Sequence, residues 1–179
     1  QENSRRIPST SRSFLVWLRG GFDAYVRIEV INMYSFTVFE KSGIEPQACA
    51  VVYGIKTGLL PTSSLPDFEE YAIANNETDG SPELLVFEGT SEEAIAALSG
   101  AGYFDDGRGR DILRYAILAS LDSKGQALLD DIESVYSDFG YPRDMEPCVY
   151  YMPSEDGSTD KLIARYHEFL ASEKARLNL

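Results

Sequence analysis

Apolar residues recur at helical spacing along most of the chain after residue 45. They stand three or four positions apart, which places them on one face of a helix, and Gly, Pro or Ser separates each stretch from the next. The pattern predicts helices near 45–57, at 64–75, at 111–121, over 128–139 and at about 159–176. It also predicts a short helix that opens at Thr90 or Ser91 and closes at Gly100, and it favours a helical turn over a strand at 81–87.

An earlier stretch, Tyr25–Phe39, has a different pattern. It is dense in β-branched and aromatic residues, and Arg27 and Glu29 alternate with apolar neighbours, which is typical of a strand. We expect one strand here, or a short hairpin that turns near Asn32. The predicted fold is therefore mainly α: an array of short packed helices with a small β element at its N-terminal end.

The 179 residues are enough for one domain with a substantial core. Residues 1–32 are rich in Arg and Ser and differ in composition from the rest, so we interpret them as an N-terminal extension and residues 33–179 as a single helical domain. One hypothesis is that Met33 is the natural start. The intact mass of the protein made from its own gene would test it.

Charge narrows the class of partner. The net charge is −13, and residues 1–32 carry five arginines against three acidic residues, so the remaining 147 residues hold −15. Such a surface repels nucleic acid and anionic membranes and attracts basic proteins. No apolar run reaches the length of a membrane span, and Cys49 and Cys148 lack the spacing of a metal or redox motif, so we expect a cytoplasmic protein with two free cysteines.

The chain shows little catalytic chemistry, and no cofactor is expected. Its one histidine, His167, lies inside the predicted C-terminal helix with no nucleophile nearby in sequence. Three carboxylates, Asp105, Asp106 and Asp111, could bind a divalent cation. Two arginines interleave with them, and we interpret the tract as an internally neutralised turn without metal. A carboxylate-dependent metal hydrolase nevertheless stays as an alternative function.

Two acidic strips are the stronger candidates for a binding surface. Such strips are either solvated helix faces or a surface that docks onto the basic cleft of a nucleic-acid-cutting enzyme. Neighbouring tyrosines would supply the apolar anchors that tight binding requires. The candidate residues are Asp67, Glu69, Glu70 and Tyr71 in the first strip, and Asp130, Asp131, Glu133, Tyr136, Asp138 and Tyr141 in the second.

Two tracts carry a resemblance to a known family. They are Val-Tyr-Ser-Asp-Phe-Gly-Tyr-Pro at 135–142, followed by Tyr-Tyr-Met-Pro at 150–153, and Tyr-Gly-Ile-Lys-Thr-Gly-Leu-Leu-Pro at 53–61, followed by Asp-Phe-Glu-Glu-Tyr-Ala at 67–72. Over roughly residues 45–153 the chain resembles the bacterial domain-of-unknown-function family 2247. The resemblance implies an immunity protein of a polymorphic toxin or contact-dependent growth inhibition system, which binds and blocks a cognate toxin domain. A helical adaptor or scaffold protein is a further alternative.

Overall fold

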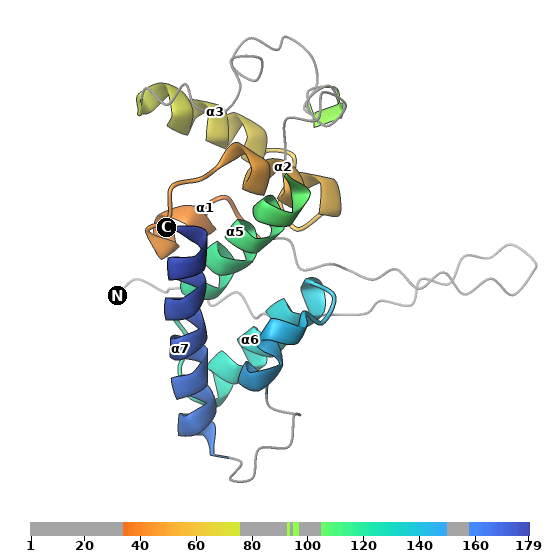
Figure 1. The fold of residues 1–179 in the computed structure, drawn as a ribbon. Coiled ribbons are helices and arrows are strands. Elements are labelled where there is room, and N and C mark those ends of the chain that lie inside the picture. The colour runs from red at the N-terminus through yellow and green to blue at the C-terminus, as the bar shows by residue number, and fades with distance from the viewer. Residues whose placement is uncertain (1–33, 76–92, 94, 97–104, 150–157) are drawn as a thin grey trace, which may run out of the picture.

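Every regular element that the computed structural model describes is a helix. The described residues are 34–75, 93, 95–96, 105–149 and 158–179. The helices, drawn in Figure 1, are α1 (Thr37–Ser42), α2 (Ala48–Thr57), α3 (Ser64–Ala74), α5 (Asp106–Ala119), α6 (Gln126–Asp138), the 3-10 helix η1 (Arg143–Cys148) and α7 (Thr159–Leu177). The predicted helical array is thus confirmed within these ranges.

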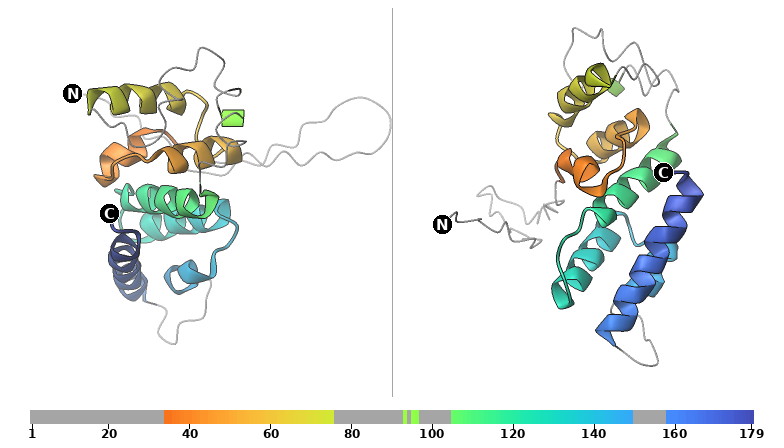
Figure 2. Two further views of the ribbon diagram at one scale, coloured as in Figure 1. Left: turned by 45° about the horizontal axis from the view of Figure 1, so that its top comes forward. Right: turned by 90° about the vertical axis from the view of Figure 1, so that its left-hand side faces the viewer.

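Helix α5 is the centre of the fold. It contacts α1, α2, α6 and α7, and in Figures 1 and 2 it separates α1 to α3 on one side from α6 and α7 on the other. All residues from Ile112 to Leu118 are buried, as expected for a helix surrounded by others. Helix α3 packs against α2 and lies far from α6, at the other end of the molecule.

The start of α5 differs from the prediction. The helix begins at Asp106 rather than near Asp111, because the Asp105 side chain caps it: Oδ1 accepts hydrogen bonds from the backbone N–H of Gly107 at 2.8 Å and of Arg108 at 3.1 Å. The two glycines and the alternating charges hide the apolar period in this first stretch. The tract predicted as a turn is therefore the beginning of the central helix.

The end of the predicted β element is also helical. Residues Thr37–Phe39 belong to α1, which ends at Gly43 with a left-handed φ of 68°. Val38 and Phe39 are buried in the core, so packing overrides the β propensity of these residues. Residues 25–33 lie outside the described residues, as do the extension 1–32 and the stretch 81–87. Of the helix predicted between 90 and 100, the described residues Glu93, Ile95 and Ala96 are helical.

Candidate protein-binding groove between α1 and α3

A groove of about 450 Å3 lies between α1 and α3. The buried side chains of Phe39 and Ile44 and the half-buried Phe36 give it an apolar base, and the Phe36 and Phe39 rings stand 5.4 Å apart at a tilt of 54°. Exposed carboxylates belong to both walls: Glu40 on α1, and Asp67 and Glu70 on α3. We call this feature the α1–α3 groove.

The amphipathic pattern of α3 explains why these carboxylates face the groove. One side of the helix, with Leu65, Phe68 and Ala72, is buried. The groove side carries Asp67, Glu70, Tyr71 and Ala74, which stand at i, i+3, i+4 and i+7 and so form a single stripe. Helix α3 thus has two different faces. Its apolar face packs in the core, and its acidic face, which also carries one aromatic residue, lines the groove.

The groove carboxylates are not neutralised within the part of the chain that the structure describes. There, Glu40, Asp67 and Glu70 take part in no ion pair, and α3 contains three acidic residues and no basic one. The third, Glu69, lies outside the groove lining, and partial burial raises the pKa of its carboxyl group. Asp67, Glu70 and Tyr71 of the first predicted strip therefore line a concave surface, where the two carboxylates are available to a partner.

The second predicted strip, on α6, is used largely by the fold itself. Tyr136 is 3% exposed, so its prediction as an accessible anchor is wrong: it packs in the core instead. Asp131 accepts a hydrogen bond from the Ser123 hydroxyl at 2.5 Å, and Asp138 accepts one from the Tyr34 hydroxyl at 2.6 Å. Because α3 and α6 lie at opposite ends of the molecule, the two strips do not form one surface.

Three candidates on or after α6 are exposed. Asp130 accepts a hydrogen bond from Gln126 at 2.9 Å, and Glu133 is exposed to solvent. Tyr141 is 62% exposed with a left-handed φ of 61°, and its ring forms a T-shaped pair with the Tyr136 ring, with the ring centres 5.3 Å apart. These three residues are exposed to solvent, and none of them lines the α1–α3 groove.

The Tyr34–Asp138 hydrogen bond leads to a prediction. Burial raises the pKa of Asp138 although the Tyr34 hydrogen bond lowers it, so the ionised carboxylate costs stability once the pH rises above the unfolded value. Tyr34→Phe should therefore destabilise the fold by about 1–2 kcal/mol at neutral pH, because the half-buried carboxylate loses its donor. Asp138→Asn should cost less, since an amide oxygen still accepts the bond and carries no charge.

Urea denaturation at pH 7 measures both variants. The loss in free energy of unfolding caused by Tyr34→Phe should also become smaller as the pH falls through the raised pKa of Asp138, because the protonated carboxyl group carries no charge. A cost for Asp138→Asn that exceeds the cost of Tyr34→Phe would contradict this assignment.

The carboxylates of the alternative metal site do not converge. Asp105 caps α5, Asp106 pairs with Lys56 at 3.0 Å, and Asp111 is held by Arg110 and Arg176. Among the described residues no group of three His, Cys, Asp or Glu side chains is arranged to hold a metal ion. The alternative of a hydrolase built on these three residues has no support in their geometry.

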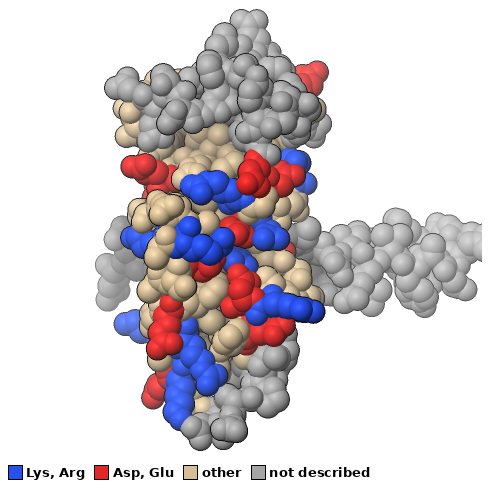
Figure 3. Space-filling model, in the orientation of Figure 1, with Lys and Arg blue, Asp and Glu red and all other residues tan. Residues whose placement is uncertain are grey.

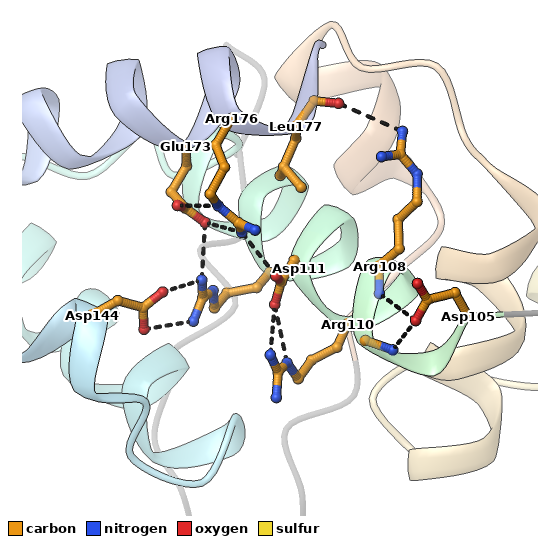
Figure 4. A network of polar contacts seen from close by, with 10 residues as sticks. Asp105, Arg108, Arg110, Asp111, Asp144, Glu173, Arg176 and Leu177 are labelled. Carbon is orange, nitrogen blue, oxygen red and sulfur yellow. Dashed lines mark hydrogen bonds and ion pairs between the residues drawn. The ribbon is translucent and has the colours of Figure 1, made fainter.

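An ionic network that the sequence reasoning missed joins α5, η1 and α7 (Figure 4). Arg114, 2% exposed, binds both carboxylate oxygens of Asp144, at 2.9 and 2.5 Å, and Glu173 at 3.0 Å. Arg176 holds Glu173 through two hydrogen bonds of 2.8 Å and reaches Asp111 at 2.8 Å, and Arg110 completes the series on Asp111 at 3.0 Å. The one signal in the sequence is Arg114 in the middle of an apolar helical stripe.

The network's charges compensate one another. Burial acts to raise the pKa of Asp111, but hydrogen bonds from Arg176 and Arg110 outweigh it and leave the pKa below its ordinary value. The hydrogen bonds from Arg176 to Glu173 and Asp111 raise the pKa of that guanidinium. With three arginines and three carboxylates in alternation, the network holds helices together and offers no net charge to a ligand.

The nucleophile and base candidates stand in unreactive settings. Cys148 is buried, and burial raises the pKa of its thiol to about 11; burial raises the pKa of the half-buried Cys49 as well. Both are free cysteines. His167 is exposed and lies beside the Tyr166 ring at 5.3 Å, on the edge of a second hollow between α7 and the α5–α6 connection. A thiolate nucleophile is disfavoured at both cysteines.

One face of the molecule carries charges of both signs. On the face shown in Figure 3, Lys and Arg side chains alternate with Asp and Glu. None of the helices that the structure describes combines the length and the apolar composition that crossing a membrane demands. The α1–α3 groove brings Glu40, Asp67 and Glu70, which make no ion pair among the described residues, together with an apolar base.

Comparison with known proteins places the chain in a family. Searches of curated proteins and of solved structures returned no match. A family model described as an uncharacterized protein conserved in bacteria matches residues 36–174, more than three quarters of the chain. The match extends the resemblance noted at 45–153 in both directions and includes all described helices from α1 to most of α7. The chain therefore belongs to this bacterial family, DUF2247.

Proposed function

We propose that this protein is an immunity protein: a cytoplasmic, non-catalytic inhibitor that binds one cognate bacterial toxin domain and neutralises it. The toxin is a nuclease, and the inhibitor covers its basic active-site region. Nucleases bind a polyanionic backbone, so an acidic protein surface is electrostatically complementary to their clefts.

The observation that carries the proposal is the α1–α3 groove. It combines Glu40, Asp67 and Glu70, which make no ion pair among the described residues, with an apolar base, and a protein interface needs both charge complementarity and buried anchors. By contrast, Asp111, Asp144 and Glu173 are neutralised by arginines in the Arg114 network. The arrangement suits binding of a basic protein.

Coexpression tests the proposal. The toxin domain encoded immediately upstream should arrest growth when expressed alone, and this protein should restore growth and copurify with it. A second, unrelated nuclease toxin serves as the specificity control and should remain toxic. A toxin that is neither bound nor neutralised would overturn the proposal.

Association should also depend on salt. Because acidic side chains steer a basic partner, the association rate constant should fall several-fold or more between about 0.05 and 0.5 M salt, while the dissociation rate constant changes less. Stopped-flow fluorescence at several ionic strengths measures both rates. Equal association rates at all salt concentrations would exclude electrostatic steering by this surface.

A peptide-binding adaptor is the second candidate, because the same groove would also serve one. The two functions separate in the growth assay. An adaptor binds its partner without abolishing the partner's activity, so copurification without rescue of growth would favour the adaptor.

A further inference from the structure

We infer that the α1–α3 groove binds a short amphipathic helix of a basic protein partner, with apolar side chains on the groove base and Arg or Lys side chains on Glu40, Asp67 and Glu70. The inference deepens the proposed function and rests on it for the identity of the partner. It names the recognition element, which the proposed function leaves open.

The dimensions of the groove favour a helix of limited length. Helix α3 has 11 residues and spans about 16 Å at the helical rise, which corresponds to about three turns of a partner helix lying along it. The groove volume of about 450 Å3 accepts a few side chains, and it is bounded by two helices, as in complexes where an amphipathic helix lies in a groove.

The order of residues along the groove fits the periodicity of such a helix. Asp67, Glu70 and Ala74 follow one another at about one turn on α3, and Glu40 faces them from α1. A partner helix with apolar residues at i, i+4 and i+7 and cations beside them would place a cation near each carboxylate. The aromatic rings of Phe36 and Phe39 at the base and of Tyr71 on the α3 wall suit the flat guanidinium of Arg as well as aliphatic side chains.

Two other occupants of the groove are tested by experiment: charge disfavours the first of them and favours the second. A second copy of this chain would bring another acidic α3 to the same place. The chain's own residues 1–32 hold five arginines and join the described chain two residues before the groove residue Phe36. A dimer that a groove-blocking substitution dissociates, or a peptide affinity that rises tenfold when residues 1–32 are deleted, would overturn the assignment to a partner helix.

Three variants of the full chain separate local contact from general charge. The groove variant carries Glu40→Lys, Asp67→Lys and Glu70→Lys. The matched comparison carries Asp130→Lys, Glu133→Lys and Glu168→Lys, which are exposed residues of α6 and α7 and change the net charge equally. Ala74→Trp, at an exposed position of the groove, narrows it without a charge change. Circular dichroism and the melting temperature confirm that each variant folds.

The probe is a fluorescein-labelled peptide of about 12 residues that can form an amphipathic helix when bound, with Leu at i, i+4 and i+7 and Arg at the flanking positions. Its counterpart has Glu in place of Arg. By anisotropy at about 0.15 M salt, the protein should bind the Arg peptide at least about tenfold more tightly than the Glu peptide. The groove variant and Ala74→Trp should each lose at least about tenfold in affinity for the Arg peptide, whereas the α6–α7 variant should lose no more than about threefold.

Equal affinity for the two peptides, or an equal loss in the groove and α6–α7 variants, would overturn the inference. The same variants in the growth assay distinguish the two proposals. Rescue of growth that the groove variant retains in full means that the inference fails and the proposed function stands. Peptide binding in the groove without neutralisation of the upstream toxin means that the proposed function fails and the inference of a helix-binding groove stands.

Discussion

Arg114→Ala should lower the free energy of unfolding by about 3 kcal/mol, a large share of the stability of a domain of this size. Arg114 is 2% exposed and binds two carboxylates from different elements, Asp144 of η1 and Glu173 of α7. Its removal leaves Glu173, 6% exposed, with one partner instead of two. It also removes a side chain whose guanidinium lies 5.7 Å from the Phe169 ring centre.

The size of this stability loss depends on which carboxylates can be solvated once Arg114 is removed. The Asp144 side chain is 47% exposed and can be solvated again, and Glu173 keeps Arg176. The loss should therefore lie at the lower end of the range for broken buried ion pairs, which is about 3–5 kcal/mol. The remaining cost comes from the poorly solvated Glu173 and from the cavity left between α5 and α7.

Two companion variants identify the cause. Arg110→Ala is the matched control, because the Arg110 side chain is 49% exposed and Asp111 keeps Arg176; it should cost less than about 1 kcal/mol. Arg114→Met retains much of the apolar stem, so it separates lost packing from lost charge, and adding Glu173→Leu to it should recover part of the loss. Guanidinium denaturation with intrinsic fluorescence measures all of them.

The stabilities of these variants test whether Arg114 holds α7 to α5. If Arg114→Ala costs no more than Arg110→Ala, the network does not hold α7 to α5. If Arg114→Met with Glu173→Leu is less stable than Arg114→Met alone, the stranded carboxylate is not the source of the cost.

Gly109→Ala should lower the free energy of unfolding by about 2 kcal/mol. A Cβ atom at this position of α5 would lie 2.3 Å from the backbone oxygen of Cys49 and 2.7 Å from its carbonyl carbon, which are parts of α2. Backbone atoms inside a helix cannot move alone, so the α2–α5 crossing itself must shift. Overpacking of this kind costs about 1–3 kcal/mol, and this contact is at the severe end of it.

A graded glycine series tests the reason. Gly54→Ala should cost about 1 kcal/mol, because its Cβ would meet the ends of flexible side chains, Leu60 at 2.6 Å and Leu113 at 2.9 Å. Gly107→Ala is the control on α5: its nearest contact is the Asp105 side chain at 3.1 Å, so the better helix propensity of Ala should leave stability unchanged or raise it by up to about 1 kcal/mol. Thermal and urea unfolding should rank Gly109→Ala as the least stable of the three.

The packing of α2 against α5 at Gly109 also affects the α1–α3 groove. Helix α2 packs against α5 and carries α3, and α3 forms one wall of the α1–α3 groove. A shift of α2 at Gly109 should therefore weaken binding of the Arg peptide even though no groove residue is changed. A Gly109→Ala variant that is destabilised but binds the peptide normally would show that the groove is independent of the crossing.

Helix positions were the most predictable part of the structure. Apolar residues at helical spacing located α2, α3, α6 and α7 to within a few residues, because these helices bury one face and expose the other. The prediction failed where tertiary contacts decide: α1 lies in a sequence with β propensity, and the first turns of α5 carry Gly and charged residues that show no apolar period.

Only some residues of the candidate site were predicted from the sequence. Asp67, Glu70 and Tyr71 line the groove. Glu40 of its opposite wall was not among the predicted residues, because it directly follows Tyr25–Phe39, which was expected to be a strand or a short hairpin. Tyr136 was assigned to the surface although it is buried, since Val135 and Tyr136 are neighbours in sequence that both turn toward the core. The Arg114 network was missed as well, because its members come from three separate segments.

The sequence by itself determined the family, the helical class and the excess of acidic residues, because these depend on local patterns and composition. Only the tertiary structure decided which acidic residues are available to a partner. Charges at Asp111, Asp144 and Glu173 are neutralised by arginines distant in sequence, whereas those of Asp67 and Glu70 meet Glu40 across an apolar base. The physical reason is that pairing of charges depends on distances across the fold, and a linear pattern of charges does not contain those distances.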